Sequence, residues 1–291
     1  MRIQHNISAM FALRNIAMNQ RLCERSLMRL ASGYRINSAA DDPAGLAVSE
    51  KMRSQIRGLS AARNNTQDGI SLLQTAEGNL NETHSILQRM LELATQSANG
   101  TYQNEADRKF AEKEFNALRE EIDRIARTTH FNGQYLLNGN FAKKEGPDPG
   151  GLTLQVGADS SESSRFTVFL PDMSAAAIGL SDASIATQED AQKAMGLIQK
   201  AIDSVSEARA GMGTAQRTLE RTLSCIDTMS ENLISAESRI RDVDMAKEIM
   251  EFAKHNILVQ AGMAMLAQAN QQSRLILKLL ESCYVKKDKD K

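Results

Sequence analysis

The chain has 291 residues, and its 35 basic and 36 acidic side chains nearly cancel. This balance argues against a nucleic-acid partner, because phosphate binding needs a strong basic excess. No apolar run approaches the ~20 residues that span a membrane, and the amino terminus lacks the apolar core of a cleaved secretion signal. Aromatic residues make up only 4% of the sequence, whereas 14 methionines are present. Leucine, isoleucine, alanine and methionine must therefore supply the apolar packing, as is typical of helices packed on helices.

Residues 3–32 are predicted to form one amphipathic helix, because apolar side chains recur along them at helical spacing. Ser32 and Gly33 are a plausible stop, since glycine favours the left-handed conformation that ends many helices. The apolar stripe of this helix includes Ile3, Ile7, Met10, Leu27 and Leu30.

A polar connector follows at residues 37–43 and leads into a second, longer helix. Asp41 or Asp42 is expected to cap this helix, because a carboxylate at that position accepts a hydrogen bond from a free backbone N–H group. Pro43 suits the first turn, where no N–H group is needed. An internal ladder of leucines supports the helix, which is expected to end at residues 99–100.

A third helix is predicted at about residues 104–129, after which the character of the sequence changes. Residues 131–133, Phe-Asn-Gly, indicate a turn. Residues 152–156 and 165–169 are rich in β-branched and aromatic side chains and are predicted to form a β-hairpin. We therefore expect a small patch of β structure at about 131–180.

Two interleaved seven-residue ladders run through residues 191–243, which are predicted to form a long helix. Such a repeat keeps one apolar seam of a helix facing a partner helix. At 1.5 Å per residue the segment would be roughly 80 Å long, which a compact enzyme core seldom needs. One ladder is Ala191, Ile198, Val205, Met212, Leu219, Ile226, Leu233 and Ile240, and the other is Ala194, Ala201, Ala208, Ala215, Thr222, Met229, Ala236 and Val243.

A last helix is predicted at about residues 244–280, and the charged residues 281–291 are predicted to be a disordered tail. The first and last helices can cover each other's apolar stripes only if the chain folds back at its middle. The expected fold is mainly α, a long antiparallel coiled-coil-like bundle with a small central β-hairpin region. The expected parts are residues 1–43 with 244–280, and a helical domain at 44–243.

No set of residues predicts catalysis, a cofactor or a metal. None of the histidines has a second histidine three or four positions away, so no helical metal pair exists. There is no glycine-rich phosphate loop and no Gly-x-Ser-x-Gly motif. The three cysteines, Cys23, Cys225 and Cys283, are an odd number at wide spacing and predict neither a disulfide framework nor a metal site.

Long segments at both ends of the chain resemble bacterial flagellin. The amino-terminal resemblance includes residues 3–9, 30–37 and 40–47, and the carboxy-terminal resemblance includes residues 236–246 and 265–270. Together the resembling segments cover most of residues 1–280. The resemblance implies a structural subunit that self-assembles into the helical flagellar filament and has no enzymatic activity.

The same resemblance implies where parts of the chain would lie in a filament. The first and last helices would pair in the filament core, and the middle helices and hairpin would form the next shell. Only about 60 residues separate the third and fourth helices, so the large outer domains of many flagellins are absent. Filament-core packing would involve Ile3, Ile7, Met10, Leu27, Leu30, Ile249, Phe252, Leu258 and Leu266.

The resemblance also places a receptor-recognition pattern on the second and third helices. Arg89, Leu93 and Glu114 occupy the positions that Toll-like receptor 5 recognises in the family, and Leu91 stands where an arginine is usual. The alternative interpretation is that these residues contact neighbouring subunits in the filament.

Partners and location follow from the resemblance as well. Besides other copies of the chain, it implies a flagellar export chaperone, filament cap and hook-associated proteins, and export through the flagellar type III apparatus. The filament would be extracellular, or periplasmic in a spirochaete. An alternative function is that of a hook–filament junction protein.

Overall fold

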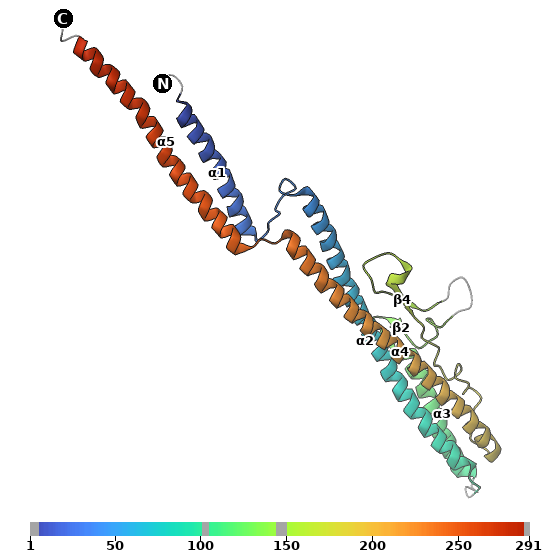
Figure 1. Ribbon diagram of the computed structural model, residues 1–291. Coiled ribbons are helices and arrows are strands. Elements are labelled where there is room, and N and C mark those ends of the chain that lie inside the picture. Colours follow the sequence, from blue (N-terminus) through green and yellow to red (C-terminus); the bar gives the residue numbers. More distant parts are fainter. Residues whose placement is uncertain (1–5, 101–104, 144–149, 288–291) are drawn as a thin grey trace. The chain divides into compact units, whose positions relative to one another are not determined.

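The computed structural model describes residues 6–100, 105–143 and 150–287. The chain divides into two compact units (Figure 1). We call residues 1–53 and 233–291 the terminal unit, and residues 54–232 the central unit. As predicted, the fold is mainly α, with five long helices and two short antiparallel β-hairpins among the described residues.

Helix α1 (Ile7–Ser32) begins and ends with capping groups. The side chain of Asn6 accepts a hydrogen bond of 3.1 Å from the N–H group of Ala9. Gly33 has φ 75°, a left-handed conformation that costs glycine little, and its N–H group donates to the carbonyl oxygen of Arg29 at 2.9 Å. The predicted stop at Gly33 is confirmed.

Helix α2 (Pro43–Ala98) is capped by the second of the two candidate carboxylates. Asp42 Oδ1 accepts a 2.9 Å hydrogen bond from the N–H group of Gly45, which is the geometry of an N-cap. Helix α3 (Glu105–Thr128) follows, within two residues of its predicted bounds where these are described.

Two hairpins follow α3. The first joins β1 (His130–Phe131) to β2 (Gln134–Tyr135). Its two turn residues, Asn132 and Gly133, have φ values of 48° and 79°, as the tight Asn-Gly hairpin turn requires. The second joins β3 (Leu152–Gln155) to β4 (Arg165–Val168) through a loop that contains the 3₁₀ helix η1 (Glu162–Ser164), and it confirms the predicted hairpin.

The core of the central unit is formed by α2, α3, the hairpin region and α4 (Gln188–Arg241), and Figure 1 shows these helices side by side. One predicted ladder of α4 is buried at six successive rungs from Ala191 to Ile226. The second ladder is buried only near its start, at Ala194 and Ala201, and its later rung Met229 is 51% exposed. The first ladder is therefore the seam that faces the core.

The hairpin β3–β4 packs against α2 at positions where α2 has glycine. A Cβ atom at Gly58 would lie 2.8 Å from the Cβ atom of Ala158, and one at Gly69 would lie 2.5 Å from Leu154 Cδ1. A larger residue at Gly58 would force Ala158 of the hairpin to shift, whereas one at Gly69 would force the Leu154 side chain to move. The glycines thus set how closely the hairpin approaches α2.

Helix α5 (Met245–Lys287) is longer than the sequence predicted. It includes residues 281–287, for which the sequence predicted disorder, so that prediction is wrong for these residues. The remaining tail, residues 288–291, lies outside the described residues.

Candidate functional site

The terminal unit consists mainly of α1 and α5, which pack along each other in antiparallel fashion (Figure 1). Asn6 Nδ2 donates a 3.0 Å hydrogen bond to the carbonyl oxygen of Ala269. A Cβ atom at Gly262 would lie 2.7 Å from Ile16 Cγ1, so the two helices approach closely there. These contacts fix the register of the pair.

The seam between α1 and α5 is formed mostly by small and polar residues. On each helix the more buried positions recur at intervals of three and four, as in a coiled coil. On α1 they are Ala9, Ala12, Ile16, Asn19, Cys23, Ser26 and Leu30, flanked by Asn15, Leu22 and Arg29, and on α5 they are Glu248, Phe252, His255, Val259, Gly262, Leu266 and Ala269, flanked by Glu251. Such a seam brings the backbones close together, and no large apolar side chain described in it is fully buried.

Most of the large apolar side chains described on this helix pair instead point outward. A coiled coil normally places such side chains in its seam, whereas here each is 42–66% exposed. They are Ile7, Met10, Phe11, Leu13, Met18, Leu27 and Met28 on α1, and Met245, Ile249, Met250, Ile257, Leu258, Met263, Met265 and Leu275 on α5. Exposed apolar surface of this extent marks an interaction surface. We call these residues the outer apolar face.

The residues predicted to pack in a filament core divide between these two surfaces. Leu30, Phe252 and Leu266 lie in the seam, and Ile3 lies outside the described residues. The exposed members are Ile7, Met10, Leu27, Ile249 and Leu258. In the single chain the two helices therefore cover only part of each other's apolar stripes.

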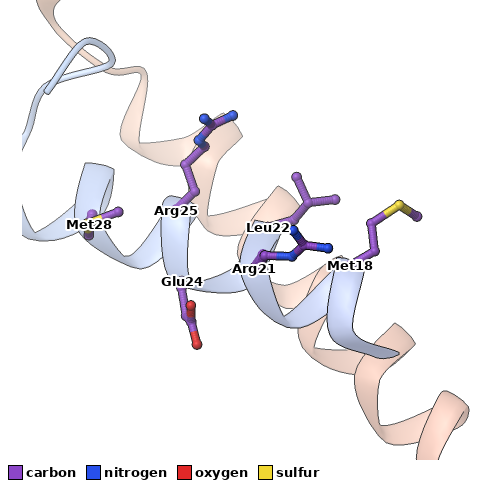
Figure 2. A pocket seen from close by; sticks show the side chains of 6 residues that line it. All are labelled: Met18, Arg21, Leu22, Glu24, Arg25 and Met28. Carbon is purple, nitrogen blue, oxygen red and sulfur yellow. The ribbon is translucent and has the colours of Figure 1, made fainter. Parts of the chain in front are cut away.

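Residues of α1 line a groove of about 410 Å³. Figure 2 shows Arg25 and Leu22 projecting on one side of the helix and Glu24 on the other. The other lining residues are Met18, Arg21 and Met28. A surface with apolar and charged groups so close together suits a protein helix better than a small apolar ligand.

Two connecting segments of the terminal unit are held together beyond α1. The N–H group of Arg35 donates to the carbonyl oxygen of Arg241 at 2.7 Å, and the N–H group of Val243 donates to that of Gly33 at 3.0 Å. These two bonds flank a bridge between Tyr34 and Asp242. The connectors therefore form a minimal antiparallel β-pair, which we call the connector bridge.

Charged side chains surround the connector bridge. The guanidinium of Arg241 lies 4.9 Å from the ring centre of Tyr34, and its Nη1 atom lies 2.6 Å from Glu50 Oε1. Arg35 donates through Nη2 to the carbonyl oxygen of Ile240 at 2.6 Å. These charged groups at the end of α4 and in the connectors are therefore used in structural contacts.

Asp41 stabilises the loop that precedes α2. Partial burial tends to raise the pKa of this carboxyl group. Hydrogen bonds from the N–H groups of Ser38 and Asn37 and the charge of Arg25 outweigh it, so the pKa of Asp41 is lowered. The Arg25 Nε atom lies 3.3 Å from Asp41 Oδ1. The two adjacent aspartates therefore have separate structural roles, in the loop and in the helix cap.

The three residues of the predicted receptor pattern lie in the central unit. Arg89 Nη2 lies 2.9 Å from Glu114 Oε1 and joins α2 to α3. Hydrogen bonds to Glu92 and Glu114 raise the pKa of Arg89. Leu93, by contrast, is only 3% exposed and belongs to the helical core. Leu93 is therefore not available as a surface contact in this conformation.

Within the described parts of the chain, no three potential metal ligands gather at one place, and no helix is long and apolar enough to span a membrane. Cys23 lies half-buried in the seam and Cys225 is exposed, and both are free thiols. The surroundings of the Cys283 side chain lie outside the described part. The most extensive unexplained feature is therefore the outer apolar face.

Two family descriptions match the chain. The bacterial flagellin N-terminal helical region matches residues 3–142, and the bacterial flagellin C-terminal helical region matches residues 195–280. The first match includes all of α1 and α2, and the second includes most of α4 and α5. The two matches cover more than half of the chain.

Relatives match over nearly the whole chain. A flagellin from Halalkalibacterium halodurans is 51% identical over 278 residues, which cover 96% of this chain and 99% of the relative. The flagellar filament 33 kDa core protein of Treponema phagedenis is 46% identical, with the same coverage of both chains. A flagellin from Bacillus subtilis is 46% identical over 96% of this chain and 100% of its own length.

A solved structure shares the fold. A putative flagellar hook-associated protein from Vibrio parahaemolyticus has a TM-score of 0.56 over 69% of this chain and 100% of its own. Its sequence identity is 14%, so it shows a common fold alone. The relatives of high identity are flagellins and filament core proteins and do not support a hook–filament junction protein. The chain therefore belongs to the bacterial flagellin family and is a structural subunit of the flagellar filament.

Proposed function

We propose that the outer apolar face of α1 and α5 is the surface through which this flagellin contacts other copies of itself in the filament. One observation carries the proposal: most of the large apolar side chains described on these helices point away from the seam that joins them. Fully burying such a side chain is worth about 1.5–3 kcal/mol. A face of this size thus provides a strong driving force for association.

The geometry of the pair suits an open polymer. The outer face of α1 and the outer face of α5 carry different residues, so copies can join by unlike surfaces. Unlike surfaces that do not close into a ring build a helical filament. In the filament the terminal unit would form the core, and the central unit, with its hydrophobic core already closed, would form the surrounding shell.

We also propose an order of folding. The central unit buries large apolar side chains from three helices within one chain, whereas no large apolar side chain described in the seam of the terminal unit is fully buried. The end helices should therefore gain most of their stability on polymerisation. Amide hydrogen exchange tests this order: in dilute subunits α2 to α4 should be protected and α1 should exchange rapidly. Strong protection of α1 in the free subunit would contradict it.

The subunit must be kept from assembling before it reaches its destination. A cytoplasmic chaperone that covers the carboxy-terminal helix would do this, because α5 carries exposed apolar residues along much of its length. Export through the flagellar type III apparatus would follow, and a cap complex would fold subunits at the growing end. Co-purification of the chain with its chaperone, and its loss on deletion of residues 245–287, tests the first step.

Recognition by Toll-like receptor 5 would depend on Arg89 and Glu114, which are half-exposed. Leu93 would support this surface from within the core. A cell reporter assay with depolymerised protein tests the proposal. A silent response, with a related active flagellin as positive control, would end it.

Polymerisation is the decisive experiment. Purified subunits should form long filaments when salt or short filament seeds are added, as seen by negative-stain electron microscopy and sedimentation. The double change Phe11→Glu and Met250→Glu places charges on the outer apolar face and should abolish filaments, while the matched surface change Met229→Glu in the central unit should have a smaller effect. Wild-type protein that stays a fully ordered monomer under all assembly conditions would refute the proposed function.

A further inference from the structure

Methionine is distributed unevenly between the two units. In the central unit Met90, Met173 and Met212 are buried in the core, Met195 is partly buried, and Met229 is 51% exposed. Seven others belong to the outer apolar face and are 46–66% exposed, namely Met10, Met18, Met28, Met245, Met250, Met263 and Met265. The surface that must become dry on assembly therefore carries a large share of the chain's thioethers.

We propose that these seven methionines form an oxidation-sensitive modification site, through which peroxides control whether a free subunit can assemble. The proposal rests on the proposed function of the outer apolar face. In the reaction a thioether sulfur attacks one oxygen of hydrogen peroxide and the O–O bond breaks. The sulfur gains that oxygen and is oxidised by two electrons, and after a proton transfer the peroxide leaves as water. Methionine becomes methionine sulfoxide.

Oxidation changes the property of the face that assembly needs. A sulfoxide oxygen is a strong hydrogen-bond acceptor, and burying it without a donor costs free energy, whereas the thioether is apolar and adapts to its neighbours. Met18 and Met28 line the groove on α1, so oxidation there changes a recessed part of the surface. Each sulfoxide that must be desolvated should raise the critical concentration for assembly about tenfold.

The same geometry makes the modification conditional on the assembly state. In a free subunit the seven sulfur atoms belong to half-exposed side chains and can react with a small oxidant. In a filament the proposed contacts cover them, so the same residues become protected. Met90, Met173 and Met212 are protected in both states, because they lie in the core of one chain. Their reactivity provides an internal reference.

The first experiment measures site-specific oxidation of the full chain. Free subunits and preformed filaments are treated with dilute hydrogen peroxide, and peptide mass spectrometry follows each methionine. To remove competing thiol reactions, Cys23, Cys225 and Cys283 are each replaced by alanine. The seven outer methionines should oxidise at least about ten times faster than the three buried ones in free subunits, and should slow towards the buried rate in filaments.

The second experiment measures the consequence for assembly. Oxidised subunits should fail to add to seeds at concentrations where untreated subunits add, and methionine sulfoxide reductases of both stereospecificities, MsrA and MsrB, should restore addition. A variant with leucine at the seven outer positions should assemble and should be insensitive to peroxide, because leucine has similar volume and no sulfur. The matched control, with leucine at Met90, Met173 and Met212, should remain sensitive.

Two results would overturn the proposal. One is unchanged assembly of subunits whose seven outer methionines are shown to be oxidised. The other is inhibition that persists after the reductases have removed the sulfoxides. Reductase rescue needs no substituted protein, so this arm is decisive even if the leucine variant fails to fold. A different outcome, in which untreated wild-type protein forms no filaments, would refute the proposed function of the outer apolar face. The untreated sample therefore distinguishes failure of that function from failure of the oxidation proposal.

Discussion

The two units of this flagellin use the same helical repeat in opposite ways. In the central unit the repeat places large residues such as Leu219 and Ile198 in the core, where they are fully buried. In the terminal unit the seam positions hold residues such as Ala12, Ser26 and Gly262, and the large residues face outward. One chain can thus contain a unit whose apolar side chains are buried within the subunit and another whose apolar side chains need other subunits to cover them, although both units are built from amphipathic helices.

The test of this contrast with the largest expected effect compares two phenylalanines. Phe115 is 0% exposed in the central core and Phe11 is 57% exposed on the outer apolar face. Phe115→Ala should lower the free energy of unfolding of the central unit by about 3–5 kcal/mol. Phe11→Ala should change the stability of the free subunit by less than about 0.5 kcal/mol and instead raise the critical concentration. Denaturant unfolding and sedimentation measure the two effects, and equal destabilisation by both changes would break the contrast.

A second test places the same substitution in both units with opposite expected signs. Gly262→Ala puts a Cβ atom 2.7 Å from Ile16 Cγ1, so overpacking should cost about 1–3 kcal/mol and loosen the α1–α5 seam. Gly78→Ala in α2 meets nothing within 4 Å and should stabilise the helix by about 0.5–1 kcal/mol. Amide exchange of α1 in filaments and thermal unfolding of the central unit report the two results. A neutral Gly262→Ala would show that the seam is not a close approach.

A third test concerns the connector bridge. Arg241→Lys keeps the positive charge but loses the planar group that lies over Tyr34, and the shorter reach weakens the contact with Glu50. We expect a loss of about 1 kcal/mol, seen as faster amide exchange of residues 33–37. Arg239→Lys, on the exposed face of the same helix, is the matched control and should leave this exchange unchanged.

The smallest expected effect is a pH dependence of the loop before α2. Because the pKa of Asp41 is lowered in the folded chain, its contribution to stability is present above its ordinary value of 3.8 and is lost as the pH falls through the lower folded value. Amide exchange of residues 37–38 should therefore accelerate only in strongly acidic solution. Asp41→Asn cannot titrate and should remove this change while Asp42→Asn retains it.

The helices, their caps and the ladder in α4 could be predicted because each has a local signal. Gly33 ends α1 through a left-handed conformation, and Asp42 caps α2. The buried residues of α4 from Ala191 to Ile226 recur every seven positions, as in a coiled coil. These signals lie within a few residues of the feature they produce. Which of the two ladders of α4 faces the core was not evident from the sequence, because both are largely apolar.

The orientation of α1 and α5 could not be predicted in the same way. A hydrophobic repeat shows that a helix has an apolar side, but it does not say whether that side meets the same chain or another copy. The actual seam contains Asn19, Cys23 and His255, which a search for apolar residues overlooks. The burial of Leu93 could not be predicted for a related reason: its neighbours Arg89 and Glu92 are exposed, yet its own position on α2 faces the core.

The connector bridge has a mechanical consequence. Tension that pulls the two chain ends apart would separate α1 from α5 turn by turn, because the small side chains of the seam resist little at any one point. The separation would then reach residues 33–35 and 241–243. There, two backbone hydrogen bonds and the hydrogen bond of the Arg35 side chain resist the force together. Separation of the two helices would pause at this point. In a filament under tension, α1 and α5 would then separate and pair again while the rest of each subunit stays folded.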